Sequence, residues 1–283
     1  MRLKTLITNL NNPIFLVDAS GVLYSHSGFL PAAANTFTFI QSKGPTFLVT
    51  NNSYHYVNDI ICNIKKTANI NLNPQNVISS GHGLAQDSHI ASILHNKIVY
   101  FIGPDSAKHY VLDAPIKGLT NTLNNATAIV LAGIHESDFK TILDKITPIA
   151  KENKSLPIIC CNKDHYIRVA NGLQPVVGHF ASQLENMIGR PLIWFGKPLD
   201  NFSLLVKKKL NKHTLNPTKN TLFFDDNLEN VVSMQTYLGI SGCWIYKTGI
   251  FYKENVANLL KKYGKPTYAL SSFNLDETFL VLE

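Results

Sequence analysis

The 283-residue chain lacks the features that would place it in a membrane or among disordered proteins. It has no run of about eighteen apolar residues, which excludes a membrane-spanning helix. Charged residues make up only 16% of the chain and apolar residues 45%, which is typical of a globular protein. At about 100–200 residues per domain, this length predicts one large domain or two modest ones.

Signals for export and for cysteine chemistry are also scarce. Met1–Lys4 begins like a signal peptide, but the polar residues of Asn9–Pro13 interrupt the apolar stretch and no small-residue cleavage site follows. The chain has four cysteines and no C-x-x-C pair, and the adjacent Cys160 and Cys161 cannot easily chelate one ion. We therefore expect reduced, buried cysteines and a cytoplasmic protein.

A positive charge excess is present but weakly organised. The 26 Lys and Arg residues against 19 Asp and Glu give a net charge of +7, which admits phosphate esters and nucleic acid as partners. The excess is scattered except at Lys207–Lys209, which we interpret as a solvated helix face, because no nucleic-acid-binding motif accompanies it. Gly21 stands alone after the first apolar run, without a G-x-G-x-x-G motif, so the sequence does not favour a dinucleotide-binding loop.

Short apolar runs alternate with longer amphipathic stretches along most of the chain. The runs have no internal polar alternation, which is typical of strands buried on both faces. Strands alternating with helices predict an α/β fold, with parallel sheets flanked by helices. The predicted strands are 14–17, 46–49, 98–102, 128–131, 157–160, 192–195, 222–224 and 243–246. The predicted helices are 32–43, 57–68, 83–94, 136–150, 179–188, 201–211 and 228–237.

Polar side chains follow four of these strands at the point where each strand ends. In doubly wound sheets, ligands bind beyond the carboxyl ends of the strands, so these side chains are expected to converge. Carboxylates suit Mg²⁺, which keeps phosphate oxygens in its shell, while Lys and Thr bind the phosphate itself. The sequence therefore predicts a site for a phosphate with a divalent metal. The converging residues are Asp18, Ser20, Thr50, Asn51, Lys197, Asp225 and Asp226.

These strand ends, in this order, resemble the four motifs of the haloacid dehalogenase superfamily of phosphohydrolases. The first motif, D-x-D-G after a strand, is matched by Asp18–Gly21, and the second, a strand-ending Thr or Ser, by Thr50. The third, a Lys, is matched by Lys197, and the fourth, an acidic pair, by Asp225 and Asp226.

The spacing of the motifs resembles one branch of that superfamily. Thr50 and Lys197 are 147 positions apart, which is room for an inserted cap domain. The motifs within this interval are similar to the N-P-D … G … P-G … G-K-P series of the class IIA capped branch, which includes nitrophenylphosphatase-like, ribonucleotide and pyridoxal-phosphate phosphatases. The resemblance implies a Rossmann-like core of residues 1–80 and 191–283 with an inserted α/β cap of residues 81–190. The matching segments are Asn162–Asp164, Asn171–Gly172, Pro175–His179, Gly196–Pro198 and, after the last strand, Thr248–Gly249.

The resemblance also implies a role for each matched residue. Asp18 is expected to attack phosphorus in line and form an aspartyl-phosphate, which water then hydrolyses. Mg²⁺ is expected to be held by Asp18, by the backbone carbonyl of Ser20 and by one Asp of the acidic pair. We favour Asp226, because it best overlays the family's G-D-N-L form, and Asp225 then supports the metal shell and Lys197.

The remaining matched residues are expected to contact the substrate. Thr50 and the Asn51 amide would hold phosphoryl oxygens, and Lys197 would offset charge on the nucleophile and the phosphoryl group. A cap loop faces the site in this branch, and it is expected to carry further substrate contacts. The residues on this loop are Asn162, Asp164, His165 and Arg168.

The chain departs from the family pattern at its presumed proton donor. Ser20 stands where the family has a second Asp, which protonates the leaving oxygen and later activates water. Loss of a general acid costs about 10²–10⁴-fold in rate, and least for leaving groups that need no proton, such as phenolates. Asp225 replaces the usual Gly of the fourth motif, and Lys163 replaces the usual Pro of the cap loop.

These observations leave more than one function open. We favour a Mg²⁺-dependent phosphohydrolase of small phosphorylated metabolites, weakened by Ser20. A cap closing over the site would exclude macromolecules, so no nucleic acid or membrane partner is expected, while caps of this branch suggest a possible homodimer. The alternative is a catalytically impaired pseudoenzyme that binds metal and phosphate ligands as a sensor or regulator. A mutase or phosphotransferase is a third, weaker interpretation.

Each candidate also has a purely structural interpretation. Asp18 could cap a helix and the Asp225–Asp226 pair could stabilise a turn, but their register with Thr50 and Lys197 favours function. Three further histidines form no metal-ligand triad, so we expect surface or packing roles for them. These histidines are His82, His89 and His95.

Overall fold

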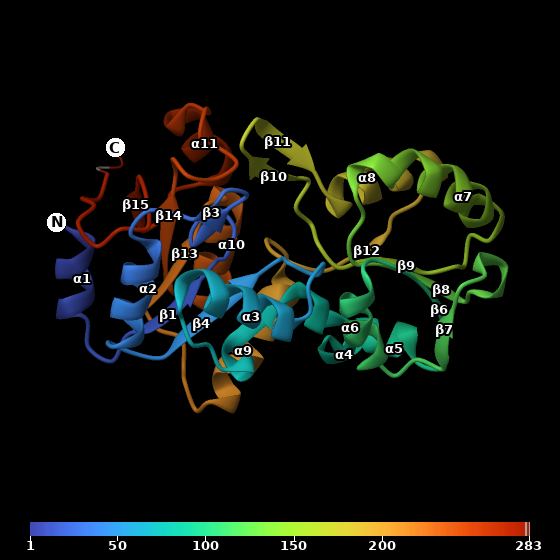
Figure 1. Ribbon diagram of the computed structural model, residues 1–283, viewed down its shortest axis with the longest axis horizontal. Helices are drawn as coiled ribbons and strands as arrows, with labels where there is room; N and C mark the ends of the chain where they lie inside the picture. Colours follow the sequence, from blue (N-terminus) through green and yellow to red (C-terminus); the bar gives the residue numbers. More distant parts are fainter. Residues whose placement is uncertain (281, 283) are drawn as a thin grey trace.

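The computed structural model describes residues 1–280 and 282 and has two lobes side by side, with both chain ends in the first (Figure 1). The first lobe is built on a parallel sheet of six strands in the order β15-β14-β13-β1-β4-β5. The strands are β1 (Ile14–Val17), β4 (Thr46–Thr50), β5 (Val77–Ser79), β13 (Thr221–Asp225), β14 (Ser241–Ile245) and β15 (Tyr268–Leu270).

Helices flank this sheet, and their apolar faces complete its core. Every residue of β1, β4, β13 and β14 is buried, which is why each of these strands contains a run of apolar residues without polar alternation. In the helix of residues 57–68, Val57, Ile60 and Ile64 are buried at the spacing of one helical face. The helices of this lobe are α1 (Leu3–Asn9), α2 (Ala33–Gln41), α3 (Val57–Ala68), α9 (Asp200–Lys212), α10 (Leu228–Leu238) and α11 (Val256–Tyr263).

The second lobe contains a parallel sheet of five strands in the order β12-β9-β8-β6-β7. Its strands are β6 (Ile98–Ile102), β7 (Gly118–Thr120), β8 (Ala128–Leu131), β9 (Ile158–Cys160) and β12 (Ile193–Trp194). Its helices are α4 (Gly83–Gln86), α5 (Ser88–Leu94), α6 (Lys108–Leu112), α7 (Phe139–Glu152) and α8 (Val177–Ile188).

The strand β12 shifts one boundary expected from the sequence. Because β12 pairs with β9, the second sheet extends past residue 190, where the cap was expected to end. The resemblance had assigned this segment to the core, as part of residues 191–283. The assignment of the first lobe as core and of the second as inserted cap stays a prediction from the resemblance.

Two antiparallel hairpins add to the sheets. One consists of β2 (Tyr24–Ser25) and β3 (Gly28–Phe29) and directly follows the Asp18 loop. The other, β10 (Tyr166–Val169) with β11 (Gly172–Pro175), leaves the second lobe and reaches towards α11 of the first (Figure 1). The hairpins therefore bring segments of both lobes close to the carboxyl ends of the first sheet.

The observed elements match the sequence expectations for the long apolar runs. Each predicted strand is present, but the predicted helix 83–94 is divided at Asp87, whose carboxylate accepts a hydrogen bond from the Ile90 amide and begins α5. The short strands β5, β7 and β15, the hairpins, and the helices α1, α6 and α11 were not predicted. Over the described residues, no helix is both long and apolar enough to cross a membrane.

Candidate functional site

The site begins where three adjacent strands of the first sheet end. The order β13-β1-β4 places Asp225, Asp18 and Thr50 at neighbouring carboxyl ends. Lys197 comes from the loop after β12 in the second sheet, and its Nζ lies 2.7 Å from Asp18 Oδ1 and 2.6 Å from Asp225 Oδ2. Residues far apart in sequence thus form one buried polar cluster, as the motif order predicted.

Three buried carboxylates form the acidic part of this cluster. Asp18, Asp225 and Asp226 each offer one oxygen within 4.8 Å of the others. Burial raises the pKa of Asp18 to about 7, with a further contribution from Asp225 and an opposing one from Lys197. Burial and the neighbouring carboxylates also raise the pKa of Asp226 well above its usual value.

The charge balance of the cluster fits a divalent cation. Three ionised carboxylates and the ammonium of Lys197 would leave two negative charges in a buried space. A cation of charge +2 among oxygen ligands would compensate them and favour the ionised forms. Hard oxygen ligands of this kind suit Mg²⁺ or Ca²⁺.

The two carboxylates of the acidic pair differ in how they are held. Both oxygens of Asp225 are engaged, with Lys197 Nζ on one and the Asn227 amide at 2.8 Å and the Asn230 side chain at 3.3 Å on the other. Asp226 accepts one hydrogen bond on Oδ2, from the Ile250 amide at 3.0 Å. Asp226 therefore has more capacity left for a metal than Asp225, and its role as the direct ligand stays a prediction.

Two glycines enclose the Asp226 carboxylate. A Cβ atom added to Gly21, which has a φ of +76°, would lie 2.6 Å from Asp226 Cγ. A Cβ atom on Gly249 would approach the same carboxylate even more closely. Glycine at both positions is thus required by the close approach of backbone to this side chain.

Lys197 is fixed as a buried cation. Besides the two carboxylates, its Nζ donates to the Val49 carbonyl at 3.2 Å. Burial alone would lower the pKa of Lys197, but the carboxylates of Asp18, Asp225 and Asp164 raise it above its usual value. The side chain therefore stays an ammonium and can neutralise charge on an incoming phosphoryl group.

The Asn51 side chain links the two lobes. Its Oδ1 accepts from the Lys197 amide at 2.7 Å, and its Nδ2 donates to the Lys197 carbonyl at 2.9 Å and to Asp164 Oδ1 at 3.0 Å. These bonds engage the side-chain amide with protein groups, so the side chain orients Lys197 and Asp164. The contact of the Asn51 amide with a phosphoryl oxygen stays a prediction. Thr50 Oγ1 accepts from the Asn52 amide at 3.1 Å, which leaves its hydroxyl proton available as a donor.

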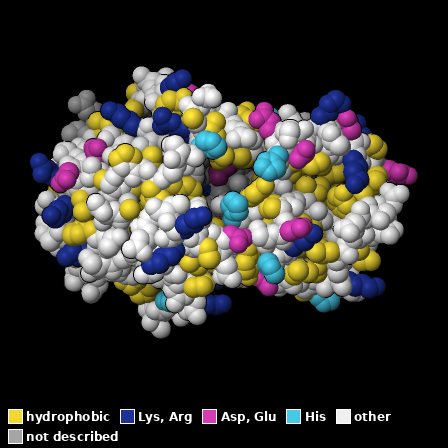
Figure 2. Space-filling view, in the orientation of Figure 1, with side chains coloured by type: hydrophobic (Ala, Val, Ile, Leu, Met, Phe, Trp, Pro, Cys, Tyr) yellow, Lys and Arg dark blue, Asp and Glu magenta, His cyan; other side chains and the backbone are white. Residues whose placement is uncertain are grey.

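A cavity of about 550 Å³ opens above the cluster, between the lobes. Asp18, Ser20 and Thr50 line one side of it, and Asn162 and Asp164 of the second lobe line another. Figure 2 shows a hollow at the middle of the molecule, with histidines around its rim and acidic atoms in its depth. A volume of this size suits a small-molecule ligand.

Comparisons with known proteins bear on the fold that carries this cluster. Residues 15–117 match the model of a family described as haloacid dehalogenase-like hydrolases. A solved possible sugar phosphatase of the same superfamily, from Cytophaga hutchinsonii, superposes with a TM-score of 0.82 at 22% identity and covers 96% of this chain and 97% of its own. The chain has the haloacid dehalogenase-like fold.

Other solved structures with this haloacid dehalogenase-like fold are phosphatases by name. The p-nitrophenyl phosphatase from Archaeoglobus fulgidus has a TM-score of 0.75 at 18% identity, covering 93% of this chain and 97% of its own. The glycerol phosphate phosphatase from Mycobacterium tuberculosis, in complex with calcium, has a TM-score of 0.75 at 14% identity. The match covers 96% of this chain and 76% of its own. No curated protein matches the chain in sequence. The resemblance identified from the motifs is confirmed.

Two residues expected on the cap loop do not line the cavity. Arg168 donates to the Lys247 carbonyl at 2.8 Å and stacks over Tyr252 at 3.7 Å from the ring centre. His165 Nε2 is paired with Ser182 Oγ at 3.2 Å. Because side chains alternate along a strand, it is the residue before Arg168, Ile167, that lines the cavity.

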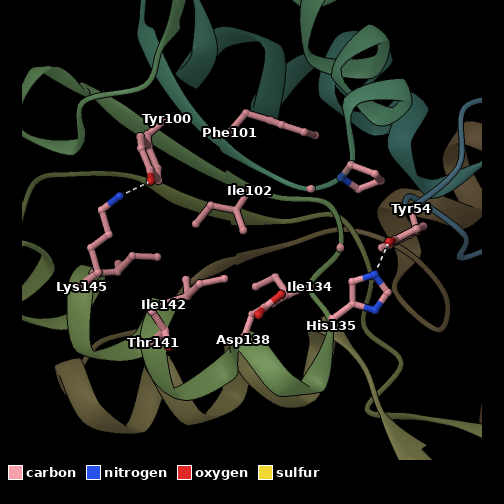
Figure 3. A pocket seen from close by; sticks show the side chains of 14 residues that line it. Tyr54, Tyr100, Phe101, Ile102, Ile134, His135, Asp138, Thr141, Ile142 and Lys145 are labelled. Carbon is pink, nitrogen blue, oxygen red and sulfur yellow. Dashed lines mark hydrogen bonds between the residues drawn. The ribbon is translucent and has the colours of Figure 1, made fainter.

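Several aromatic and histidine side chains line the cavity without having been predicted. Tyr54 of the first lobe and His135 of the second are joined by a hydrogen bond of 2.7 Å between Tyr54 Oη and His135 Nε2. This pair also borders a second cavity of about 440 Å³, whose other end holds Tyr100 and Lys145 (Figure 3). These residues belong to no motif and are brought together only by the packing of the lobes, so the sequence carries no signal for them.

Proposed function

We propose that the chain is a Mg²⁺-dependent phosphohydrolase of small phosphorylated metabolites that acts through an aspartyl-phosphate. The observation that carries the proposal is the position of Asp18, which lies at the cavity beside Lys197 and next to the carboxylates of Asp225 and Asp226. A carboxylate so placed can attack phosphorus and be regenerated by water.

The residues of the site have complementary tasks in this proposal. The Asp18 carboxylate attacks the phosphorus, while Lys197 and the Thr50 hydroxyl neutralise and bind the phosphoryl oxygens. Asp18, the Ser20 carbonyl and Asp226 would hold the cation, which offsets the negative charge of phosphate and carboxylates. Asp225 keeps Lys197 in place through their 2.6 Å ion pair.

The substrate class follows from the size and the walls of the cavity. A space of about 550 Å³ between two lobes admits a small phosphate ester and excludes nucleic acid or a folded protein. The printed names of the similar structures, a sugar phosphatase, a nitrophenyl phosphatase and a glycerol phosphate phosphatase, support a small phosphate monoester. A cytoplasmic location and a possible homodimer are part of the same proposal.

A second candidate function is a non-catalytic phosphate sensor. It is favoured by Ser20, which lines the cavity with a hydroxyl that is a far weaker acid than a carboxyl group. Such a protein would keep the cation and phosphate sites but turn substrate over negligibly.

Hydrolysis of 4-nitrophenyl phosphate with Mg²⁺ tests the two functions. We expect turnover by the wild type, a loss of at least about 10³-fold in Asp18→Asn, and no loss in Asp144→Asn, an exposed carboxylate paired with Lys140 on α7. Equal activity of wild type and Asp18→Asn would overturn the proposed phosphohydrolase. A silent wild type with activity gained in Ser20→Asp would favour the sensor.

A further inference from the structure

Hydrolysis of an alkyl phosphate requires a proton that the nucleophile cannot give. The leaving oxygen departs as an alkoxide unless an acid protonates it in the transition state. Asp18 acts as a carboxylate, and the hydroxyl of Ser20 is too weak an acid near neutral pH. A donor must therefore come from elsewhere in the cavity.

Asp164 is a carboxyl group of the second lobe that lines the same cavity as Asp18 and Ser20. Its Oδ1 accepts from Asn51 Nδ2 at 3.0 Å, and its backbone amide donates to Asn162 Oδ1 at 2.7 Å. Asn51 in turn holds the backbone of Lys197 on both sides. The carboxyl group is thus fixed relative to the ammonium that contacts the nucleophile.

The second oxygen of Asp164 is available for proton transfer. Within the part of the chain that the structure describes, no donor forms a hydrogen bond with Oδ2. Burial raises the pKa of Asp164 to about 6, with Asp225 adding to the effect and Lys197 and Asn51 opposing it. A carboxyl group with a pKa near neutrality can serve first as an acid and then as a base.

Other proton donors around the cavity are less suited. Burial and the Asp18 charge raise the pKa of Tyr24 to about 12, which makes its phenol a weak acid. His26 and His55 are exposed at the rim, and the His135 ring is paired with Tyr54.

We propose that Asp164 is the general acid and base of this site, taking the task that Ser20 cannot perform. This inference rests on the proposed phosphohydrolase function. As an Asp18 oxygen bonds to phosphorus, the bond from phosphorus to the leaving oxygen breaks and that oxygen takes the Asp164 proton, giving an alcohol and the Asp164 carboxylate. Water then attacks phosphorus and passes a proton to the Asp164 carboxylate, while the bond from phosphorus to the Asp18 oxygen breaks and phosphate leaves. This step restores the Asp18 carboxylate and the Asp164 carboxyl group.

The test compares leaving groups that do and do not need a proton. Asp164→Asn keeps the acceptor oxygen for Asn51 but cannot donate an acidic proton. We expect kcat/KM to fall by less than about threefold for 4-nitrophenyl phosphate and by about 10²–10⁴-fold for glycerol phosphate. Adding Ser20→Asp to Asp164→Asn should restore at least part of the activity on glycerol phosphate. Asp144→Asn is the matched control and should leave both rates unchanged.

The outcomes separate the inference from the function on which it rests. Equal losses for both substrates in Asp164→Asn would overturn the inference, because a residue that merely positions Asn51 slows both reactions alike. Activity that survives Asp18→Asn, or a wild type that hydrolyses neither substrate, would overturn the proposed function and the inference with it. Loss confined to glycerol phosphate, with Asp18→Asn inactive on both substrates, is the result we expect.

Discussion

At the scale of single residues, the site depends on where side chains are absent as much as on where they are present. The Asp226 carboxylate lies against the bare backbone of Gly21 and Gly249 and accepts the Ile250 amide. Gly249 has an ordinary backbone conformation, so its substitution by alanine tests space alone, whereas Gly21 also requires its positive φ.

We predict that Gly249→Ala displaces the Asp226 carboxylate and weakens the cation site. Because a misplacement of about 1 Å near the reacting groups can cost about 10²-fold, the rate at saturating Mg²⁺ should fall by about that factor. The Mg²⁺ concentration for half-maximal rate should rise as well. Gly118→Ala is the control, since a Cβ there meets no atom within 4 Å. An unchanged Mg²⁺ dependence in Gly249→Ala would show that the Asp226 carboxylate is not a cation ligand.

The residues of the site were predictable to the extent that they end buried strands. Asp18, Thr50 and the acidic pair follow continuous apolar runs, and parallel strands bring such positions to one edge. The direction of Arg168, in contrast, depends on the register of a hairpin that the sequence did not reveal. The engagement of Asn51 with Lys197 depends on how the lobes meet, for which a single sequence has no signal.

At the scale of elements, Arg168 on β10 anchors the hairpin β10–β11 of the second lobe to the first lobe. The guanidinium donates to the Lys247 carbonyl and stacks on Tyr252, while Ile167 and Gln174 of the same hairpin line the cavity. A two-stranded hairpin is marginally stable alone, so the Arg168 contact contributes much of the stability of β10–β11.

We predict that Arg168→Ala loosens the hairpin without unfolding the protein. Stacking and the charge-assisted hydrogen bond together contribute about 1–3 kcal/mol, so amides of β10 and β11 should exchange hydrogen about 5- to 150-fold faster. KM for 4-nitrophenyl phosphate should rise more than kcat falls, because the change affects a cavity wall and not Asp18. Arg190→Ala is the comparison, because the Arg190 guanidinium donates to the Leu156 carbonyl and not to the first lobe. Equal exchange in wild type and Arg168→Ala would contradict the anchoring role.

The strands that the sequence missed share a physical reason. β5, β7 and β15 have three residues each, and β7 and the hairpin β10–β11 are only partly buried. Such segments are held by their neighbours in the sheet, so their own composition says little. The longer buried runs were predictable because burial on both faces demands apolar residues throughout.

At the scale of the whole molecule, a small set of contacts fixes the two lobes around the cavity. Ser53 Oγ donates to the Ala132 carbonyl at 2.6 Å, Tyr54 bonds with His135, and Asn51 with Asp164. All three first-lobe residues lie on the loop that follows Thr50, so the phosphate-side loop and the second lobe are ordered together. The presence of two units was predictable from the distance between motifs, whereas these contacts were not.

The stability of the whole molecule should also depend on a histidine near the junction of the lobes. Burial lowers the pKa of His82 to about 4, with Lys209 adding to the effect and the Ser79 backbone opposing it. The ring packs edge-on against Tyr110, and its Nδ1 accepts from the Ser79 amide at 3.1 Å. The unfolded chain therefore binds a proton on this residue more readily than the folded one does.

This difference makes the folded state lose stability as the pH falls. The contribution of His82 to the free energy of unfolding is fully present above the unfolded pKa of 6.5 and is lost as the pH falls towards 4. At pH 5 the loss amounts to about 2 kcal/mol. Between pH 7.5 and 5 the free energy of unfolding, measured with urea, should fall in both proteins. We predict that it falls by about 2 kcal/mol less in His82→Gln than in the wild type. His89→Gln, exposed on α5, should follow the wild type. Because both variants keep every carboxylate of the site, the difference between them isolates the partly buried His82 ring. Identical pH profiles of the wild type and His82→Gln would mean that the folded protein binds the His82 proton as readily as the unfolded chain does.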